Sequence, residues 1–221
     1  MERLTTAPAL PVRGIGPGEV TVAGLTAGGC ALLLFVSQEC PTSAMALRRL
    51  GPLCRAWQEH GLTSVAVFED PLEVAVRVAR RLGWGGMVVS QDPPYEASRG
   101  YGLVSVPTAV LIGPGASRVE GTVTGWDQPA LADLIGKAGG LLRADLAVPD
   151  AAEPLQKPGC SSKAAIDPEL AAAMSAPAGS DDLEEMFERG WTDGLPVISL
   201  TPDRVEAMLR GADGQVSLGL V

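Results

Sequence analysis

The stretch Cys30-Ala-Leu-Leu-Leu-Phe-Val-Ser-Gln-Glu-Cys-Pro-Thr-Ser43 joins an apolar run to a helical pattern through a single cysteine, Cys40. The run from Cys30 to Val36 is too short for a soluble buried helix or a membrane span, so it predicts a fully buried strand. After Cys40, Pro41 suits the first turn of a helix, and apolar residues recur at helical spacing as far as Trp57. The sequence therefore predicts a strand that leads into a helix, with Cys40 at the junction.

Cys40 lies at or next to the N-cap of the predicted helix. Unpaired backbone N–H groups and the positive end of the helix dipole favour an anionic sulfur there, which lowers the pKa of a cysteine from its free value of about 8.5. We therefore expect Cys40 to be a nucleophile. The alternative is a small buried residue at a strand end, as free cysteine often is.

The composition predicts a globular protein with a real core, since 46% of the 221 residues are hydrophobic. A net charge of −9 without any Lys/Arg cluster argues against nucleic acid and against an anionic membrane surface as partners. The residues before Cys30 contain no continuous apolar segment of the kind found in signal peptides. A cytoplasmic location is the resulting prediction.

Four cysteines, Cys30, Cys40, Cys54 and Cys160, are expected to be mostly free thiols in a reducing compartment. They form no C-x-x-C pair and no Cys/His ligand set, so we expect neither a structural metal site nor a cofactor. Cys30 and Cys54 are interpreted as core residues. Cys54 also lies fourteen residues beyond Cys40 along one predicted helix, roughly 21 Å at 1.5 Å per residue, too far for a disulfide.

Strand and helix patterns alternate after Cys40, which predicts a parallel sheet segment, and they end in an antiparallel hairpin around the turn Gly113-Pro-Gly115. The helix from Cys40 is expected to reach about His60. The later ranges are a strand at 62–68, a helix at 71–82, a strand at 87–90, a short helix at 94–101, the hairpin runs 104–112 and 118–124, and a helix at about 129–142.

The composition changes at about residue 144 to alanine, proline, glycine and serine. The predicted organisation is an N-terminal arm at 1–17, an α/β domain at 18–143, a linker or loosely packed wrap at 144–180, and a short helical extension at 181–221. The extension is too short for a core of its own, so it could be the start of a truncated or split second domain.

Two motifs and the order of elements together resemble the thioredoxin-like superfamily. The matching stretches are Cys40-Pro-Thr-Ser43 after a buried strand, Ser105-Val-Pro-Thr108 opening another strand, and Gly121-Thr-Val-Thr-Gly125 before the last helix. The resemblance covers about residues 18–142 and implies a central mixed sheet flanked by helices, here with an extended, partly irregular C-terminal appendage. The tail at 190–209 also resembles the start of a second bacterial domain of uncertain role.

The resemblance implies a site as well as a fold. In the superfamily the proline that matches Pro107 is cis and faces the active cysteine, so Val106 and Pro107 would form a wall for substrate together with Pro41, Thr42 and Ser43. Superfamily reductases usually carry a second cysteine where this chain has Ser43.

A lone nucleophile needs another thiol to resolve its mixed disulfide or sulfenic acid. Cys160, in the segment Pro158-Gly-Cys-Ser-Ser162, is the candidate within the chain, and an external thiol is the other possibility. The predicted function is thiol–disulfide exchange or reduction of a peroxide or another electrophile, with a thiol or disulfide substrate that could be a protein.

Two further functions remain open at this point. One is a non-catalytic binding module that positions a partner or a downstream domain contacting the C-terminal tail. The other is capture of a soft metal or organometal by Cys40 and Cys160.

Overall fold

A computed structural model describes residues 6–14, 20–115 and 118–165, and all of them fall within the compact unit Met1–Asp167. The predicted helical extension at 181–221 lies outside the described residues. No helix within the described ranges is long and apolar enough to cross a lipid bilayer.

A six-stranded sheet forms the centre of the described unit, in the order β1-β4-β3-β2-β6-β7. The strands β2, β3 and β4 run parallel, whereas β6 is antiparallel to both β2 and β7, and β1 is antiparallel to β4. The bounds are β1 Arg13–Gly14, β2 Cys30–Val36, β3 Leu62–Phe68, β4 Met87–Ser90, β6 Thr108–Ile112 and β7 Val119–Thr124. The predicted mixed sheet is confirmed.

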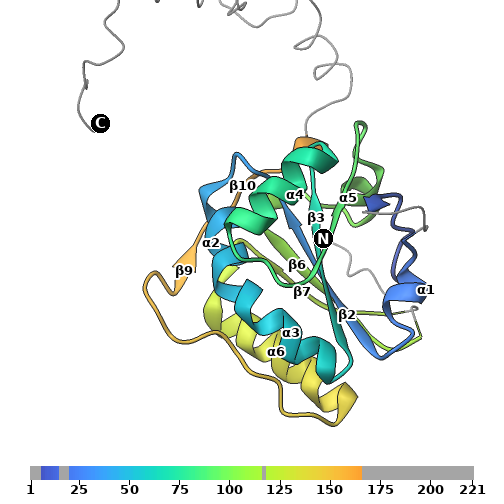
Figure 1. Ribbon diagram of the computed structural model, residues 1–221, viewed down its shortest axis with the longest axis vertical. Coiled ribbons are helices and arrows are strands. Elements are labelled where there is room, and N and C mark those ends of the chain that lie inside the picture. Colours follow the sequence, from blue (N-terminus) through green and yellow to red (C-terminus); the bar gives the residue numbers. More distant parts are fainter. Residues whose placement is uncertain (1–5, 15–19, 116–117, 166–221) are drawn as a thin grey trace, which may run out of the picture. The chain divides into compact units, whose positions relative to one another are not determined.

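Helices cover both faces of this sheet (Figure 1). The longer helices α2, α3, α4 and α6 pack on one face, and the short helices α1 and α5 pack on the other. Their bounds are α1 Val22–Leu25, α2 Pro41–Leu50, α3 Cys54–Glu59, α4 Leu72–Arg81, α5 Glu96–Gly100 and α6 Gln128–Leu142. Because helices cover both faces of the sheet, the central strand β2 is buried along its whole length and is apolar throughout.

Two predicted elements are divided in the structure. The helix expected from Cys40 to His60 is interrupted by the 3-10 turn η1, Gly51–Leu53, where Pro52 has no N–H to donate to the preceding turn. The run expected over 104–112 is divided at Pro107 into β5, Ser105–Val106, and β6. The division frees β5 to pair with a different segment.

That segment belongs to residues 144–165, which we call the strap. The strap leaves the end of α6 and runs along the outside of the domain past α6 and α2 (Figure 1). It contributes β9, Gln156–Lys157, which pairs with β8, Trp126–Asp127, and β10, Cys160–Ser161, which pairs with β5. It closes on the 3-10 turn η2, Lys163–Ala165.

Side chains of the domain hold the first part of the strap by its backbone. The indole Nε1 of Trp57 donates to the carbonyl of Ala147 at 2.7 Å. The Arg49 guanidinium donates to the carbonyls of Ala152, Glu153 and Pro154 and lies 5.0 Å from the centre of the Trp126 ring. These hydrogen bonds are accepted by backbone carbonyls, which every residue type has, so the alanine- and proline-rich composition of the strap does not prevent them.

Candidate functional site

Cys40 is the N-cap residue of α2, as the sequence predicts. Its backbone is extended, with φ −93° and ψ 112°, and its sulfur accepts a hydrogen bond from the Ser43 backbone N–H at 3.4 Å. The side chain is 1% exposed. The sulfur is therefore held at the positive end of the helix and shielded from water.

Val106 lies directly against this sulfur. The Cys40 thiol donates to the Val106 carbonyl at 3.3 Å, and the Val106–Pro107 peptide bond is cis. Both Val106 and Pro107 are buried. The residues expected as a substrate wall thus lie next to Cys40.

Cys160 belongs to β10, the strand of the strap that pairs with β5. In the antiparallel β10–β5 pair, Cys160 lies opposite Val106, whose carbonyl accepts from the Cys40 thiol, and Cys160 packs against the buried cluster that contains Cys40. Ser105 Oγ donates to the Cys160 carbonyl at 2.9 Å, which fixes the strap beside β5. The two candidate catalytic residues are brought together, and both are free thiols.

The two thiols differ in acidity. Burial opposes ionisation of Cys40, but hydrogen bonds from Cys160 and Ser43 outweigh it and lower the pKa of Cys40 below the usual thiol value. The hydrogen bond that Cys160 gives to Cys40, together with burial and the charge of Cys40, raises the pKa of Cys160 to about 11. Cys40 is accordingly the stronger acid of the pair.

The remaining predicted site residues lie in the first turn of α2. Pro41 is exposed, whereas Thr42 and Ser43 are buried. Thr42 Oγ1 donates to the Pro158 carbonyl of the strap at 2.8 Å, and the Ser43 hydroxyl accepts from the Ser37 N–H at 3.4 Å. Thr42 therefore holds the strap, while Ser43 supports the loop and the sulfur of Cys40.

Two carboxylates that sequence reasoning missed complete the site. Glu69 and Asp70 directly follow β3 and are each 1% exposed. Glu69 accepts from the Ser98 hydroxyl, the Ser162 hydroxyl and the Lys163 N–H, while Asp70 accepts from Gln38 N–H at 2.8 Å and from Lys163 Nζ at 2.9 Å. Their position after a strand parallel to β2 was the available signal, since the carboxyl ends of parallel strands meet at one edge of the sheet.

Cys30 and Cys54 lie away from this pair, in the core. Cys30 opens β2, opposite Leu62, and Cys54 opens α3. Burial is the main cause that raises the pKa of both, to about 11 for Cys54. Within residues 6–14, 20–115 and 118–165, no three His, Cys, Asp or Glu side chains gather as metal ligands.

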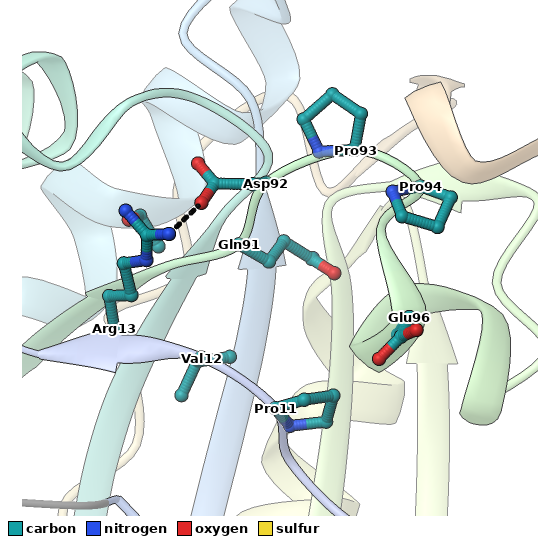
Figure 2. Close-up of a pocket in the computed structure, with 9 residues that line it drawn as sticks. Pro11, Val12, Arg13, Gln91, Asp92, Pro93, Pro94 and Glu96 are labelled. Atoms are coloured by element: carbon teal, nitrogen blue, oxygen red, sulfur yellow. Dashed lines mark ion pairs between the residues drawn. The ribbon is translucent and has the colours of Figure 1, made fainter.

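A cavity of about 440 Å³ lies at the carboxyl end of β4, apart from the two sulfurs. Figure 2 shows its lining, in which Arg13 pairs with Asp92 at 3.0 Å beneath Pro93 and Pro94. Both members of that ion pair are mostly exposed. The residues that line this cavity include none of the candidate site residues.

Solved structures give an independent view of the fold. A candidate thiol:disulfide interchange protein DsbE from Chlorobium tepidum aligns with a TM-score of 0.54 and 22% identity, over 61% of this chain and 95% of the other. The chain has the thioredoxin-like fold. A hypothetical protein from Sinorhizobium meliloti aligns over 72% of this chain and 92% of its own, with a TM-score of 0.57 and 21% identity.

A third solved structure is the thioredoxin domain of a thiol-disulfide oxidoreductase from Bacteroides vulgatus. It aligns with a TM-score of 0.52 and 17% identity, over 64% of this chain and 99% of its own. No protein-family model and no curated protein matches the sequence. The thioredoxin-like fold predicted from Cys40-Pro-Thr-Ser43 and Ser105-Val-Pro-Thr108 is confirmed.

Proposed function

We propose that this thioredoxin-like protein is a thiol–disulfide exchange protein whose redox pair is Cys40 and Cys160. The observation that carries the proposal is the packing of Cys160, in β10, against the buried cluster that contains Cys40, at the N-cap of α2: Cys160 lies opposite Val106, whose carbonyl accepts from the Cys40 thiol. A strand pair and a helix N-cap fix the two sulfurs independently. Cys160 thereby supplies the second thiol that the Cys40-Pro-Thr-Ser43 motif lacks.

The proposed reaction has two steps. The Cys40 thiolate attacks one sulfur of a substrate disulfide, forms a mixed disulfide, and expels the other sulfur as a thiolate, which takes up a proton. Cys160 then loses its proton to solvent and attacks the Cys40 sulfur, forming the Cys40–Cys160 disulfide and releasing the second substrate thiol. The substrate gains two electrons, and an external dithiol must return them to the protein.

The acidities of the two thiols support this order. A thiolate is the attacking species, and the pKa of Cys40 is lowered by its hydrogen-bond donors despite burial, whereas that of Cys160 is raised to about 11. Once Cys40 is part of a mixed disulfide, it carries no negative charge. The charge that raised the pKa of Cys160 is then gone, which favours ionisation of Cys160 at the step where it must attack.

The names of two structural neighbours agree with this class of chemistry. One is a candidate thiol:disulfide interchange protein and another is a thiol-disulfide oxidoreductase domain. Their identities to this chain are 22% and 17%, so the support for function comes mainly from the sulfur pair. A reducing compartment, such as the predicted cytoplasm, would supply the returning dithiol.

The test is oxidation of the full chain followed by disulfide mapping. We expect mild oxidation by an aromatic disulfide to give a Cys40–Cys160 bridge in a monomer, detected by mass spectrometry of unreduced peptides. Cys40→Ser should abolish turnover of the disulfide. Cys160→Ser should accumulate the mixed disulfide, and Cys54→Ala serves as the matched control with a core thiol removed.

The outcomes separate the proposal from a binding module. Turnover that persists in Cys40→Ser would contradict it, as would a Cys40 thiol that stays unreacted while the fold is intact. Mixed disulfide in the wild type without any bridge would leave Cys40 as the nucleophile and assign resolution to an external thiol.

The same sulfur contact also favours a second candidate, capture of a soft metal ion. Two thiolates are suitable ligands for a soft metal such as Cu(I). This function predicts that one equivalent of metal protects Cys40 and Cys160 together from alkylation, while neither single serine variant binds tightly. Equal binding by the wild type and Cys160→Ser would exclude a two-sulfur site.

A further inference from the structure

The strap occupies the edge of β5 as an extended peptide would, and its contacts define consecutive positions around Cys160. Val104 accepts from the Ser162 N–H at 3.1 Å, and Cys160 lies opposite Val106. Ser161 is exposed, whereas Ser162 is fully buried. The alternation is that of a strand with one side against the protein.

The position before the cysteine is closely confined. A Cβ atom on Gly159 would lie 2.4 Å from Ser105 Oγ and 2.5 Å from the Val106 carbonyl oxygen. An extended peptide with a side chain at this position would have to shift away from β5. The edge therefore suits a glycine before the cysteine.

The residues that follow Cys160 in the strap bind the two buried carboxylates, Glu69 and Asp70. Glu69 receives the Ser162 hydroxyl and the Lys163 N–H, at 2.8 Å for the latter. Asp70 receives the ammonium of Lys163 at 2.9 Å, and the exposed Glu39 lies 3.6 Å from the same ammonium. The subsite thus binds a hydroxyl, a backbone N–H and a cation in a fixed order.

A substrate that reaches Cys40 along β5 must displace these groups. The carboxylates of Glu69 and Asp70 would then lose the hydrogen bonds from Ser162 and Lys163, which costs free energy unless the incoming chain replaces the donors. A lysine or arginine supplies the matching charge, whereas a glutamate at that position would add a third carboxylate beside Asp70 and Glu39. These three carboxylates therefore favour a basic residue over an acidic one at this position.

We infer that Glu69, Asp70 and Glu39 form a subsite for the basic side chain of a cysteine-containing peptide that lies along β5 at its cysteine and turns, as the strap does at Lys163, three residues after the reacting cysteine. The inference rests on the proposed function and names its substrate class. The strap is the internal occupant of the same site, with Lys163 in place of the substrate's basic residue. Return of the strap after the first exchange step brings Cys160 to Cys40 and at the same time removes the peptide from the subsite.

The experiment uses the full chain with Cys160→Ser, which stops the reaction at the mixed disulfide. The probes are three peptides, Ala-Gly-Cys-Ser-Ser-Lys-Ala and its relatives with Ala or Glu in place of Lys, each activated as a mixed disulfide with thionitrobenzoate. Release of the coloured thiol reports attack by Cys40. Cys40→Ser gives the background from the other thiols.

We expect the Lys peptide to react about tenfold faster than the Ala peptide, and the Glu peptide more slowly still, because a charge-assisted hydrogen bond is at stake. Adding Lys163→Ala should increase the rate with the Lys peptide, since the internal competitor is removed. Asp70→Asn should abolish the preference, and Glu39→Gln, which leaves the buried pair intact, should reduce it. High salt should reduce it as well.

Asp70 also accepts a hydrogen bond from the Gln38 backbone N–H, so Asp70→Asn could disturb the fold. Its rates are compared only if its thermal unfolding and far-UV spectrum match those of the parent protein. If they do not match, Glu39→Gln is the variant that tests the subsite. Equal rates for the three peptides, with a normal rate toward the small aromatic disulfide itself, would overturn the subsite while the proposed function stands. A Cys40 that is inert toward the small disulfide and all peptides would instead overturn the proposed function.

Discussion

Cys160 lies opposite Val106, the residue whose carbonyl accepts from the Cys40 thiol, although Cys40 and Cys160 are 120 residues apart in sequence (160 minus 40). This arrangement depends on β10, which pairs with β5. The strap therefore contributes, through Cys160, to the lowered pKa of Cys40. Substitutions in the strap should therefore alter the reactivity of the Cys40 thiol, although the strap lies far from Cys40 in sequence.

The first prediction concerns the pH dependence of Cys40. Thiolate is the reactive form, so the alkylation rate rises with pH and levels off above the pKa. Because hydrogen bonds lower the pKa of Cys40 despite burial, we expect its midpoint below that of a free cysteine peptide. Cys160→Ala removes one donor and should move the midpoint upward, while Cys160→Ser, which keeps a hydroxyl, should move it less.

Iodoacetamide kinetics with mass detection of the Cys40 peptide would measure these midpoints. In wild-type molecules whose Cys40 is still unmodified, Cys160 should react much more slowly than Cys40, because its pKa, raised to about 11, leaves little thiolate near neutral pH. A Cys40 midpoint that is indifferent to Cys160→Ala would show that the hydrogen bond between the thiols has no influence.

The second prediction concerns the close approach of Gly159 to β5. Gly159→Ala places a methyl group 2.4 Å from Ser105 Oγ and should displace the strap, with a loss of about 1–3 kcal/mol in the free energy of unfolding. Bridge formation between Cys40 and Cys160 should slow down, and Cys40 should become easier to alkylate. Denaturant unfolding and timed disulfide mapping would measure the two effects.

Gly136→Ala is the matched control, since no atom lies within 4 Å of the added methyl group on α6. It should stabilise the protein by roughly 0.5–1 kcal/mol, as expected for a helical glycine replaced by alanine. If both substitutions behaved alike, steric contact at the β5 edge would be excluded as the reason.

The strands and the cysteine at their end could be predicted from local pattern alone. Cys30–Val36, Leu62–Phe68 and Met87–Ser90 have the predicted bounds because each is a short apolar run between turn residues. The N-cap position of Cys40 followed from Pro41 and the helical spacing after it. These features depend on neighbours in sequence, which a single chain displays.

The contacts between the strap and the rest of the domain could not be predicted from local sequence patterns. Its anchors are long-range hydrogen bonds to backbone carbonyls, such as those from Arg49 and Trp57, and any residue type supplies a carbonyl. The carboxylates Glu69 and Asp70 were visible after a strand, but their partner Lys163 comes from a segment without periodicity. The pairing of Cys160 with Cys40 remained one possibility among several for the same reason.

The third prediction tests how Arg49 holds the strap. Arg49→Ala removes hydrogen bonds to three consecutive residues, 152–154, and the stacking on Trp126, so protection of the strap against hydrogen exchange and proteolysis should fall. The expected loss is about 1–2 kcal/mol in local stability, given partial exposure. Arg48→Ala, at the exposed neighbouring position, is the control and should leave protection unchanged.

Arg49→Lys distinguishes charge from geometry at this point. A lysine keeps a positive charge near Trp126 but lacks the planar guanidinium that donates to several carbonyls at once. Protection of the strap against hydrogen exchange and proteolysis should therefore lie between that of the wild type and that of Arg49→Ala. Full protection in the lysine variant would mean that the positive charge alone suffices.

The last prediction concerns the pH range over which Lys163 anchors the strap. Burial lowers the pKa of Lys163, but the hydrogen bond and charge of Asp70 outweigh it, so the folded pKa lies above the unfolded one. A raised folded pKa means that the stabilisation is fully present below the unfolded value and is lost as the pH rises through the folded value. Lys163→Met should therefore cost about 1.5–3 kcal/mol at neutral pH.

The free-energy difference between the wild type and Lys163→Met should stay constant from neutral pH up to the ordinary lysine range and then shrink at more alkaline pH. Lys157→Met, on the exposed strand β9, provides the comparison and should show a small difference at every pH. Denaturant unfolding of the three proteins across pH measures this directly. A Lys163→Met difference that grew with alkaline pH would have the wrong sign for an anchor made by the lysine cation and the Asp70 carboxylate.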